Sequence, residues 1–548
     1  MPLQKNQVLT LQVERLSSDG SGVAHSPEGE TVFIPGAAPG DEARVRIVKD
    51  CKRYAFGILD EVLKPSPDRI PVDCAVAGPC GGCSLRHLDY AAELRAKQEN
   101  VADAFARIGG LDVPVLPIVG SPEIDRYRNK VQFPVGTDKA GRPCIGFYAG
   151  RTHRIVPCPD CRLQPGVLNE IGNTLCAFFA EKGIHPYNEE TGKGLVRHIF
   201  LRRGAHSGQI MVCLVSTRAK IPSADELCTR LKEAFPDIVT ILLNVNAKNT
   251  NVILGSETHT LYGQGYIEDT LCGVPVQLGP LSFYQVNTLA AEQLYGIAAE
   301  YAQLTPDDLL LDLYCGMGTI GLSMADHCRE LVGVEIVPEA IESAKANAAR
   351  MGAAVSAKSR FFCADAGQAA AQLAAEGLHP DVVMLDPPRK GCDEATLSAV
   401  VRMAPRRVVY VSCNPATAAR DAAWLEQNGY HAEKVQPVDL FPRTKHCEAV
   451  LLLTKLNVER HIEVDVSMDE LDVTAAESKA TYDEIKAYVL EKHGLKVSSL
   501  YISQVKRKCG LDVGQNYNLS KKEDAKVPQC PPEKEAAIME ALKHFQML

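Results

Sequence analysis

The sequence predicts a multidomain α/β protein. It should contain a small N-terminal β-barrel, a central α+β domain with a cysteine cluster, a C-terminal doubly wound parallel sheet and a short helical tail. At 548 residues the chain is too long for one hydrophobic core. Short alternating strands fill its beginning, and from about residue 275 apolar strands alternate with helical segments. We therefore divide the chain into five regions: 1–64, 65–100, 101–274, 275–456 and 457–548.

The composition is that of an ordinary globular protein, with 46% hydrophobic and 23% charged residues. No apolar run is long enough to span a bilayer, and the first residues lack the charged-then-apolar order of a signal peptide. We therefore expect a cytoplasmic protein with no membrane partner. Thiols stay reduced there, so the 19 cysteines are expected to be core residues, metal ligands or nucleophiles rather than disulfides.

Residues 1–64 contain the short strands QVLTLQVERL, TVFIPG, EARVRIVK and YAFGILDEVL, separated by Gly, Ser, Pro and Asp turns. Closely spaced strands of this kind predict a small β-barrel. The segment resembles a TRAM domain, an OB-like RNA-binding barrel, including its LSSDGSGVAH and FIPGAAPGDE turns.

Three cysteines mark the next region, residues 65–100. Cys74, Cys80 and Cys83 form a C-x5-C-x2-C pattern in a glycine-rich stretch that would let the chain fold around a metal. With a fourth thiolate, such a set could bind zinc or an iron–sulfur cluster equally well by count. The following segment, YAAELRAKQENVADAFARIGG, predicts a helix that ends at a pair of glycines.

Basic residues gather in three places although the net charge is −9. The clusters are RVRIVKDCKR (44–53), RYRNK (126–130) and VRHIFLRR (196–203), the last two within the mixed strands and helices of residues 101–274. Local patches attract phosphates even on an acidic chain, so these clusters are candidate RNA contacts. The alternative is that they are solvated strand faces.

The strands of residues 275–456 predict a Rossmann-like doubly wound sheet with a ligand loop. In LLLDLYCGMGTIGL (309–322), a strand runs into a glycine-rich turn in which Gly316 and Gly318 let the backbone approach a ligand. That strand carries Asp312, and Glu335 ends the next strand, where a carboxylate can accept hydrogen bonds from a ribose diol. The pattern fits NAD and S-adenosylmethionine about equally well.

The segment VVMLDPPRKG separates these two cofactors. Asp386 and two prolines end a strand at the edge where such sheets bind ligands. Amino-group methyltransferases also place an acidic or amide residue before Pro-Pro, but follow it with an aromatic residue that stacks on the base. Here that position is Arg389, which argues against chemistry on an exocyclic amine.

Cys413 ends the strand after Asp386, so both side chains are expected at the same sheet edge. A thiolate that adds to carbon 6 of a pyrimidine makes carbon 5 able to attack a methyl donor. The carbon 5 proton must then leave to a base. Glu448, which opens the last strand, is our candidate because the strand fixes its orientation, and His446 is the competing candidate.

Five motifs, FYQVN (283–287), LDLYCGMGTIGL, LDPPRKG, YVSCNPAT and HCEAV, together resemble the RNA (uracil-5-)-methyltransferase family in order and spacing. The resemblance implies a nucleophile at Cys413, a base at Glu448 and S-adenosylmethionine contacts at Gln285, Tyr314, Glu335 and Asp386, besides the loop glycines. It also implies a four-iron four-sulfur cluster on Cys74, Cys80, Cys83 and a distant fourth cysteine. Cys158 and Cys161 both offer that ligand, and we choose Cys161 from its position before RLQP.

The predicted function is formation of 5-methyluridine in 23S rRNA by a monomer. Cytosine-5 methyltransferases place a proline before their cysteine, whereas here Pro415 follows Cys413, which favours uracil. Relatives that act on tRNA are expected to lack both the barrel and the cluster, which favours rRNA. The alternatives are a tRNA (uracil-5-)-methyltransferase and a non-catalytic RNA-binding or ribosome-assembly factor.

The region after residue 456 begins with an acidic stretch that predicts a linker, followed by two or three short helices. The stretch QVKRKCG is basic, so the helices could form an added nucleic-acid-binding pair. An ordinary helical appendage is the favoured alternative.

Overall fold

The computed structural model describes residues 3–150, 152–248, 251–456, 482–509 and 530–545. The chain divides into two compact units, Met1–Asn457 and Val458–Leu548, which we describe separately.

The N-terminal strands form a closed barrel in the order β1-β2-β3-β5-β4, as predicted. Alternate side chains such as Val13, Val32, Ile34 and Val45 fill its interior. The prediction missed one strand, β2, because its residues lie in a Gly- and Ser-rich stretch that has the composition of a turn. The strands are β1 (Val8–Leu16), β2 (Ser21–His25), β3 (Thr31–Pro35), β4 (Glu42–Asp50) and β5 (Tyr54–Lys64).

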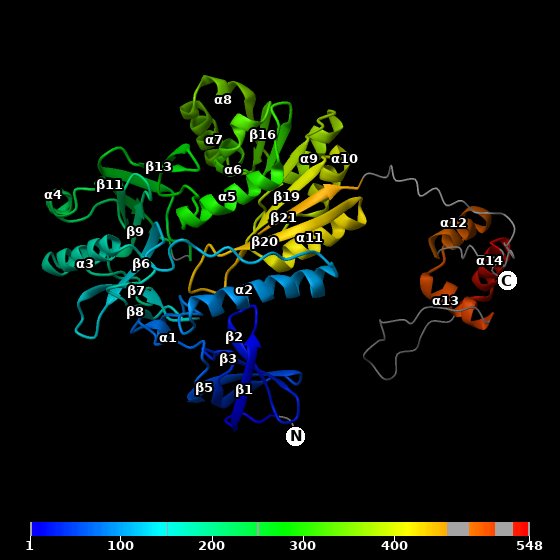
Figure 1. The fold of residues 1–548 in the computed structure, drawn as a ribbon, viewed down its shortest axis with the longest axis horizontal. Helices are drawn as coiled ribbons and strands as arrows, with labels where there is room; N and C mark the ends of the chain where they lie inside the picture. Colours follow the sequence, from blue (N-terminus) through cyan, green and yellow to red (C-terminus); the bar gives the residue numbers. More distant parts are fainter. Residues whose placement is uncertain (1–2, 151, 249–250, 457–481, 510–529, 546–548) are drawn as a thin grey trace. The chain divides into compact units, whose positions relative to one another are not determined.

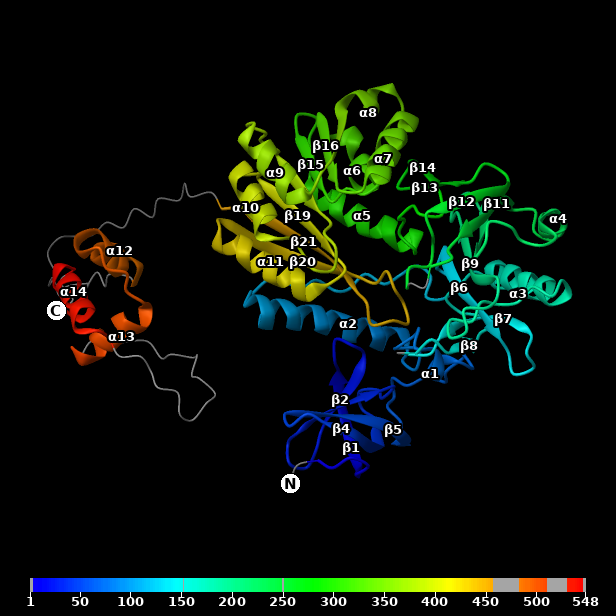
Figure 2. The same cartoon turned by 180° about the vertical axis from the view of Figure 1, so that it is seen from behind.

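Helix α2 (Tyr90–Ala104) joins the barrel to the rest of its unit. It follows α1 (Ala77–Cys80), continues into a π-helical turn, η1 (Phe105–Gly109), and lies between the barrel and the C-terminal sheet in both views (Figures 1 and 2). Leu16 and Ala38 of the barrel pack against Leu85, Leu88 and Ala96. Residue 100, where we placed the boundary between the second and third regions, lies within this helix. The five-region division remains a proposal.

The central region is built on a seven-stranded sheet in the order β12-β11-β10-β9-β6-β7-β8 (Figure 1). Two helices, α3 (Gly166–Glu181) and α4 (Ala224–Ala234), pack on it, and a two-stranded ribbon, β13 (Ile267–Leu271) and β14 (Val274–Leu278), follows. The strands of the large sheet are β6 (Lys130–Thr137), β7 (Pro143–Tyr148), β8 (Ile155–Pro157), β9 (Val196–Arg203), β10 (Ile210–Ser216), β11 (Ile238–Val245) and β12 (Glu257–Tyr262).

The C-terminal sheet has the order β17-β16-β15-β18-β19-β21-β20. Six strands run in one direction, and β21 runs antiparallel between β19 and β20, so the predicted parallel sheet is in fact mixed. The prediction also missed β20, whose sequence alternates polar and apolar residues. The strands are β15 (Leu309–Leu313), β16 (Glu330–Glu335), β17 (Ser359–Cys363), β18 (Val382–Leu385), β19 (Arg407–Ser412), β20 (Tyr430–Val438) and β21 (Glu448–Lys455).

Helices cover both faces of this sheet, which confirms the doubly wound arrangement (Figures 1 and 2). One hydrophobic core joins α5 and α7 to residues such as Val409, and the other joins α9, α10 and α11 to residues such as Val408. Helix α2 and the turn η1 add to the second core through Val101 and Phe105, respectively. The helices are α5 (Thr288–Ala302), α6 (Thr319–Ser323), η2 (Ala325–His327), α7 (Pro338–Met351), α8 (Ala353–Lys358), α9 (Ala366–Ala375), α10 (Glu394–Met403) and α11 (Pro415–Gln427).

The described residues of the second unit form three helices with a core of their own. They are α12 (Tyr482–His493), α13 (Ser499–Lys508) and α14 (Pro532–His544), and their core includes Ile485, Val489, Ile502 and Ile538. The expected helical tail is therefore present, whereas the expected linker lies outside the described residues. In the described part of the chain, no helix combines the length and apolarity needed to cross a bilayer.

Candidate active site

The sheet brings the predicted cofactor and catalytic residues to one edge. Tyr314, Glu335 and Asp386 lie at or just after the carboxyl ends of three parallel strands, and Cys413 directly follows β19. Because β21 is antiparallel, it begins at the same edge, where Ala449 pairs with Ser412. The strand reversal therefore places Glu448 beside Cys413.

These residues line a cavity of about 1400 Å³. All the predicted site residues of the sheet domain except Gly318 contribute to it: Gln285, Tyr314, Gly316, Glu335, Asp386, Cys413 and Glu448. Gly318 instead precedes α6 with a φ of +80°, and a side chain there would meet Ala344 and Phe361 at 3.2–3.3 Å. Its role in the structure is to permit the turn and the close helix packing.

Near the glycine-rich loop that follows β15, each of the two carboxylate oxygens of Glu335 accepts a backbone N–H. One accepts the N–H of Gly316 at 3.2 Å and the other accepts the N–H of Val337 at 2.9 Å. Below this loop the buried Asp312 accepts the N–H of Gly321 at 3.0 Å. Burial raises the pKa of Asp312 to about 8.

The sequence analysis did not single out Asp365 and Phe283, which also line this cavity. Asp365 follows β17 and caps α9 by accepting the N–H groups of Gly367 and Gln368. Its position directly after a parallel strand, like that of Asp386, was the signal that could have identified it. Phe283 is 72% exposed, and its place in FYQVN was the only signal available.

In the same cavity, Cys413 lies among charged groups. Burial raises the pKa of its thiol, the carboxylates of Glu448 and Asp386 raise it further, and the guanidinium of Arg389 lowers it. Burial likewise raises the pKa of Asp386 to about 7 and, together with Asp386, that of Glu448 to about 8. A thiol, two carboxyl groups and a guanidinium therefore lie close together in one cavity.

The turn after Cys413 fixes the thiol. The side chain of Asn414 donates to the carbonyl of Arg389 at 2.9 Å and accepts the N–H of Ala416 at 3.2 Å, while Pro415 starts α11. The amide thus ties the end of β19 to the Asp-Pro-Pro turn, and the proline begins the helix at once.

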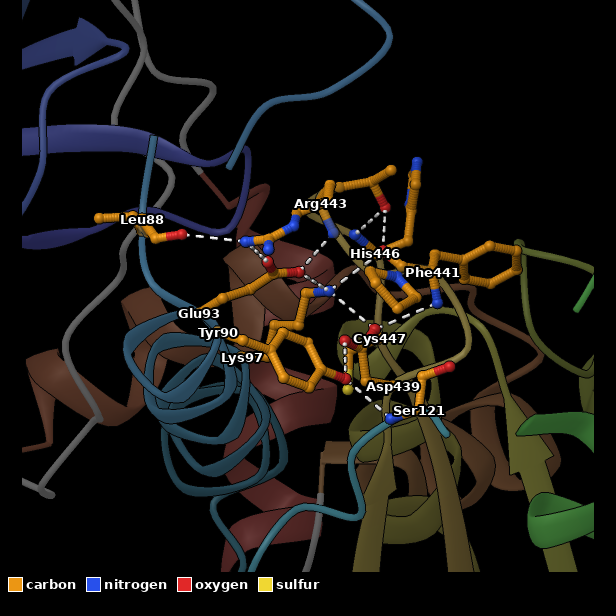
Figure 3. Close-up of polar contacts among 12 residues, drawn as sticks. Leu88, Tyr90, Glu93, Lys97, Ser121, Asp439, Phe441, Arg443, His446 and Cys447 are labelled. Atoms are coloured by element: carbon orange, nitrogen blue, oxygen red, sulfur yellow. Dashed lines mark hydrogen bonds and ion pairs between the residues drawn. The ribbon is translucent and has the colours of Figure 1, made fainter. Parts of the chain in front are cut away.

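A buried charge network holds the loop between β20 and β21 (Figure 3). The ammonium of Lys97 on α2 donates to Glu93 at 2.7 Å, to Asp439 at 2.8 Å and to the carbonyl of Phe441 at 3.2 Å. The side chain of Lys97 is 1% exposed, and those of Glu93 and Asp439 are fully buried. This network, which the sequence did not reveal, anchors α2 to the loop that leads to Glu448.

Further contacts in Figure 3 fix the same loop. The backbone N–H of Arg443 donates to Glu93 at 2.7 Å, and its guanidinium donates to the carbonyl of Leu88 at 3.0 Å. Tyr90 donates to Asp439 at 3.0 Å. These contacts hold Arg443 at a φ of +68°, a conformation that is costly for a residue with a side chain.

The predicted cysteine ligands lie close enough to affect one another. Burial raises the pKa of Cys80, and the thiols of Cys161 and Cys74 raise it further, while Cys161 also raises the pKa of Cys83. A hydrogen bond with Cys158 lowers the pKa of Cys161 and raises that of Cys158. Nevertheless, among the described residues no three His, Cys, Asp or Glu side chains converge tightly enough to hold a metal ion.

One predicted basic cluster is not a surface. Residues 196–203 form β9, in which Arg197 is 4% and Arg202 is 1% exposed. Arg202 donates to the carbonyls of Gly279 and Ser282, just before the FYQVN motif. Arg197 and Arg202 are therefore neither a solvated strand face nor an exposed RNA contact, whereas Arg203 at the end of the strand is half-buried.

A β-barrel joined to a doubly wound sheet, with a thiol, carboxylates and a glycine loop around one cavity, defines a cofactor-dependent transferase that acts on nucleic acid. Comparison with known proteins gives the family. Residues 276–456 match the family model described as tRNA (Uracil-5-)-methyltransferase, and residues 2–59 match the TRAM domain. The chain belongs to this family of S-adenosylmethionine-dependent RNA methyltransferases.

The relatives extend over most of the chain. A protein of Halalkalibacterium halodurans named uncharacterized RNA methyltransferase is 43% identical over 457 residues, 83% of this chain and 99% of that protein. One of the same name from Clostridium tetani is 40% identical over 454 residues, 83% and 98% of the two chains. The crystal structure of Pyrococcus abyssi tRNA (uracil-54, C5)-methyltransferase in complex with S-adenosyl-L-homocysteine is 27% identical, with a TM-score of 0.65 over 82% of this chain and 100% of that chain.

Proposed function

We propose that the protein forms 5-methyluridine in 23S rRNA, with Cys413 as the nucleophile and Glu448 as the base. The observation that carries this proposal is that Cys413, Glu448 and Asp386 line one cavity at one sheet edge, where both carboxylates raise the pKa of the thiol. A non-catalytic RNA-binding factor would not need to keep these buried, desolvated carboxyls beside a thiol.

The cavity suits S-adenosylmethionine together with a target base, because its volume exceeds that of most small-molecule sites. We assign the cofactor to Gln285, Tyr314, Gly316, Glu335 and Asp386. Each oxygen of Glu335 accepts one backbone N–H and keeps a lone pair that could accept a ribose hydroxyl. When bound, the cofactor supplies the methyl group to carbon 5.

The residues of the chain activate the base and release it. The thiolate of Cys413 forms a bond to carbon 6 of uracil, and the electron pair of the carbon 5–carbon 6 double bond moves toward carbon 5 and the adjoining carbonyl. After methylation, Glu448 accepts the proton from carbon 5. The electrons of that C–H bond restore the double bond, and the sulfur leaves as the thiolate.

The electrostatic environment favours Glu448 over His446 as the base. Burial and the neighbouring cations Arg389 and Lys445 lower the pKa of His446 to about 4, which makes its imidazole a poor proton acceptor. The pKa of Glu448 is raised to about 8, so its ionised form accepts a proton readily near neutral pH.

We also propose that Cys74, Cys80, Cys83 and Cys161 bind a four-iron four-sulfur cluster. The lowered pKa of Cys161 suits a thiolate ligand, whereas Cys158 serves as its hydrogen-bond donor. Anaerobic analysis should find iron and sulfide in the purified protein, and stoichiometric zinc without sulfide would contradict the assignment.

A tRNA substrate is the second candidate, and the solved P. abyssi structure favours it. Its likeness covers 82% of this chain and all of that chain, and its name gives tRNA as the substrate. The proposed reaction takes every assigned residue from one chain, which fits a monomer acting in the cytoplasm.

Labelling of 23S rRNA fragments and tRNA transcripts side by side with a radioactive methyl donor distinguishes the two substrates. The wild type should label one or two rRNA fragments, and labelling confined to tRNA would replace 23S rRNA by the second candidate. RNA containing 5-fluorouridine should form a covalent complex with the wild type, because its carbon 5 has no proton to lose. Cys413→Ala should abolish both signals, whereas Cys228→Ala, a half-buried cysteine on α4, should keep them.

A further inference from the structure

A second cavity, of about 550 Å³, opens onto Cys413 from the side of the barrel. The barrel contributes Arg15 and Phe33 to its wall, α2 contributes Asp103 and η1 contributes Arg107. Cys413, His446 and Arg389 line both this cavity and the larger one. The two cavities therefore meet at the nucleophile, and we call the smaller one the barrel pocket.

The barrel side of the pocket is aromatic. Phe33 on β3 points away from the barrel interior, which its neighbours Val32 and Ile34 fill. Its ring centroid lies 5.8 Å from those of Tyr54 and Phe56 on β5, and Tyr54 is 41% exposed. Exposed aromatic rings that touch one another on a barrel are a typical stacking surface for unpaired bases.

The rim where the barrel meets α2 and η1 is basic. Arg15 and Arg107 both pair with Asp103, at 2.9 Å and 3.3 Å, and their side chains are 48% and 66% exposed. Asp103 is the one carboxylate among the described residues that line the pocket. It holds two guanidiniums together at the rim while neutralising one of the two charges, and Lys445 adds an exposed ammonium. A phosphodiester is the anion that such an arrangement suits.

We propose that the barrel pocket binds a nucleotide next to the target uridine in the RNA strand. Its base stacks on Phe33 and its phosphate lies near Arg15 and Arg107. This inference rests on the proposed function, because the target uracil must reach Cys413. The barrel pocket and the larger cavity share Cys413, His446 and Arg389, so neighbouring nucleotides of one strand could occupy both. The volume of the barrel pocket lies within the range of small-ligand sites.

The occupancy of the pocket also explains why the barrel is fixed to α2. Arg15 reaches Asp103 across the interface, and Leu16 packs against Leu85 and Leu88 close by. A barrel that only tethered the RNA would not need a fixed distance from the nucleophile. One that stacks a base beside the target uridine does.

The test uses the full chain and the shortest transcript that the wild type methylates, with an abasic residue placed in turn at each of the two positions on either side of the target. For the wild type, one abasic position should raise KM about tenfold. Phe33→Ala should raise KM similarly on the intact transcript, and the abasic residue should then add no further effect. Phe33→Trp, which keeps a stacking surface, should behave as the wild type.

The charge contribution is measured by the dependence of affinity on salt. Arg107→Gln should reduce the slope of log affinity against log salt by about one. Lys345→Gln, an exposed lysine on α7 outside both cavities and outside the basic clusters, should leave the slope unchanged. In the wild type, 4-thiouridine at the sensitive position should crosslink to a peptide containing Phe33, a readout that does not depend on how well a variant folds.

The outcomes separate this proposal from the one on which it rests. A wild type that methylates no RNA would contradict the proposed function. A wild type that methylates RNA, while Phe33→Ala keeps the parental KM or still loses a further tenfold with the abasic transcript, would contradict the stacking assignment alone. Crosslinking confined to other regions of the chain would do the same.

Discussion

The thiol of Cys413 owes its position to the two residues after it. Asn414 hydrogen-bonds the turn that carries Arg389, and Pro415 starts α11 without a backbone N–H to satisfy. A strand that ended in a flexible loop would leave the sulfur free to change rotamer. The short turn instead holds it at the edge shared by both cavities.

Three carboxyl groups in and beside the larger cavity have raised pKa values, so they are more protonated than they would be in water. The pKa of Asp386 is raised to about 7, and those of Asp312 and Glu448 to about 8, in each case chiefly by burial. Folding therefore favours their protonated forms, and their ionisation opposes stability as the pH rises from about 4 toward these values. Such a cost is typical of a site selected for catalysis rather than for stability.

We predict that methylation increases with pH between 6 and 9. Glu448 must be ionised to accept the carbon 5 proton, and below its raised pKa of about 8 the protonated form predominates. Cys413 must be a thiolate to attack carbon 6, and its pKa is also raised. With unmodified RNA, kcat/KM should therefore fall by at least about tenfold per pH unit between pH 7 and 6. The measurement is a series of initial rates between pH 6 and 9 at fixed ionic strength.

Replacement of the base provides the control. Glu448→Gln keeps the shape of the side chain but cannot accept the proton, so turnover should fall by about 10²- to 10⁴-fold. A methylated RNA–protein adduct should then accumulate with ordinary uridine. A variant that turns over normally, or a wild-type rate that is flat from pH 6 to 8, would contradict the role assigned to Glu448.

Among the elements, the strand reversal at β21 decides the chemistry of the site. A seventh parallel strand would end rather than begin at the cavity edge, and Glu448 would lie at the far side of the sheet. The antiparallel pairing of Ala449 with Ser412 instead brings the first residue of β21 beside the last residues of β19. Because apolar content does not encode strand direction, the sequence predicted β21 as a strand but not its orientation.

Local patterns predicted most elements, whereas contacts between distant segments escaped them. The apolar runs and glycine turns identified the barrel and most strands of the C-terminal sheet. By contrast, the spacing of Arg197 and Arg202 is the same for an exposed and a buried strand, and only the tertiary packing shows that both are buried. The bond from Lys97 to Asp439 joins residues 342 positions apart, which no local pattern contains.

We expect the stability of the packing of helix α2 to depend on the ion pair between Lys97 and Asp439. Lys97→Met should lower the free energy of unfolding by about 3–5 kcal/mol, because it leaves Glu93 and Asp439 buried without their cation. Urea unfolding at pH 7 measures the change. Lys345→Met, which removes an exposed lysine paired with Glu342 on α7, is the matched control and should shift stability by less than about 0.5 kcal/mol. Equal effects of the two substitutions would show that the network contributes no more than a surface ion pair.

At the scale of the whole molecule, the two compact units contribute unequally to the two cavities. Among the described residues, all that line the larger cavity or the barrel pocket lie before residue 457. The second unit has a separate core, and its basic stretch is largely engaged: Lys506 is buried and Lys508 pairs with Glu535 on α14. These contacts favour the helical appendage over the nucleic-acid-binding pair.

We therefore predict that a chain ending at Leu456 keeps its activity. Its kcat and KM for the substrate transcript should remain within about twofold of the full-length values, because the first unit has its own cores and supplies both cavities. The H. halodurans relative is matched over 99% of its length by 457 residues of this chain, so it is about as long as the first unit. The decisive measurement is RNA affinity as a function of salt for the two chains. A shallower salt slope and weaker binding in the shortened chain would show that α12, α13 and α14 contact phosphates, and would restore the nucleic-acid-binding interpretation of the second unit.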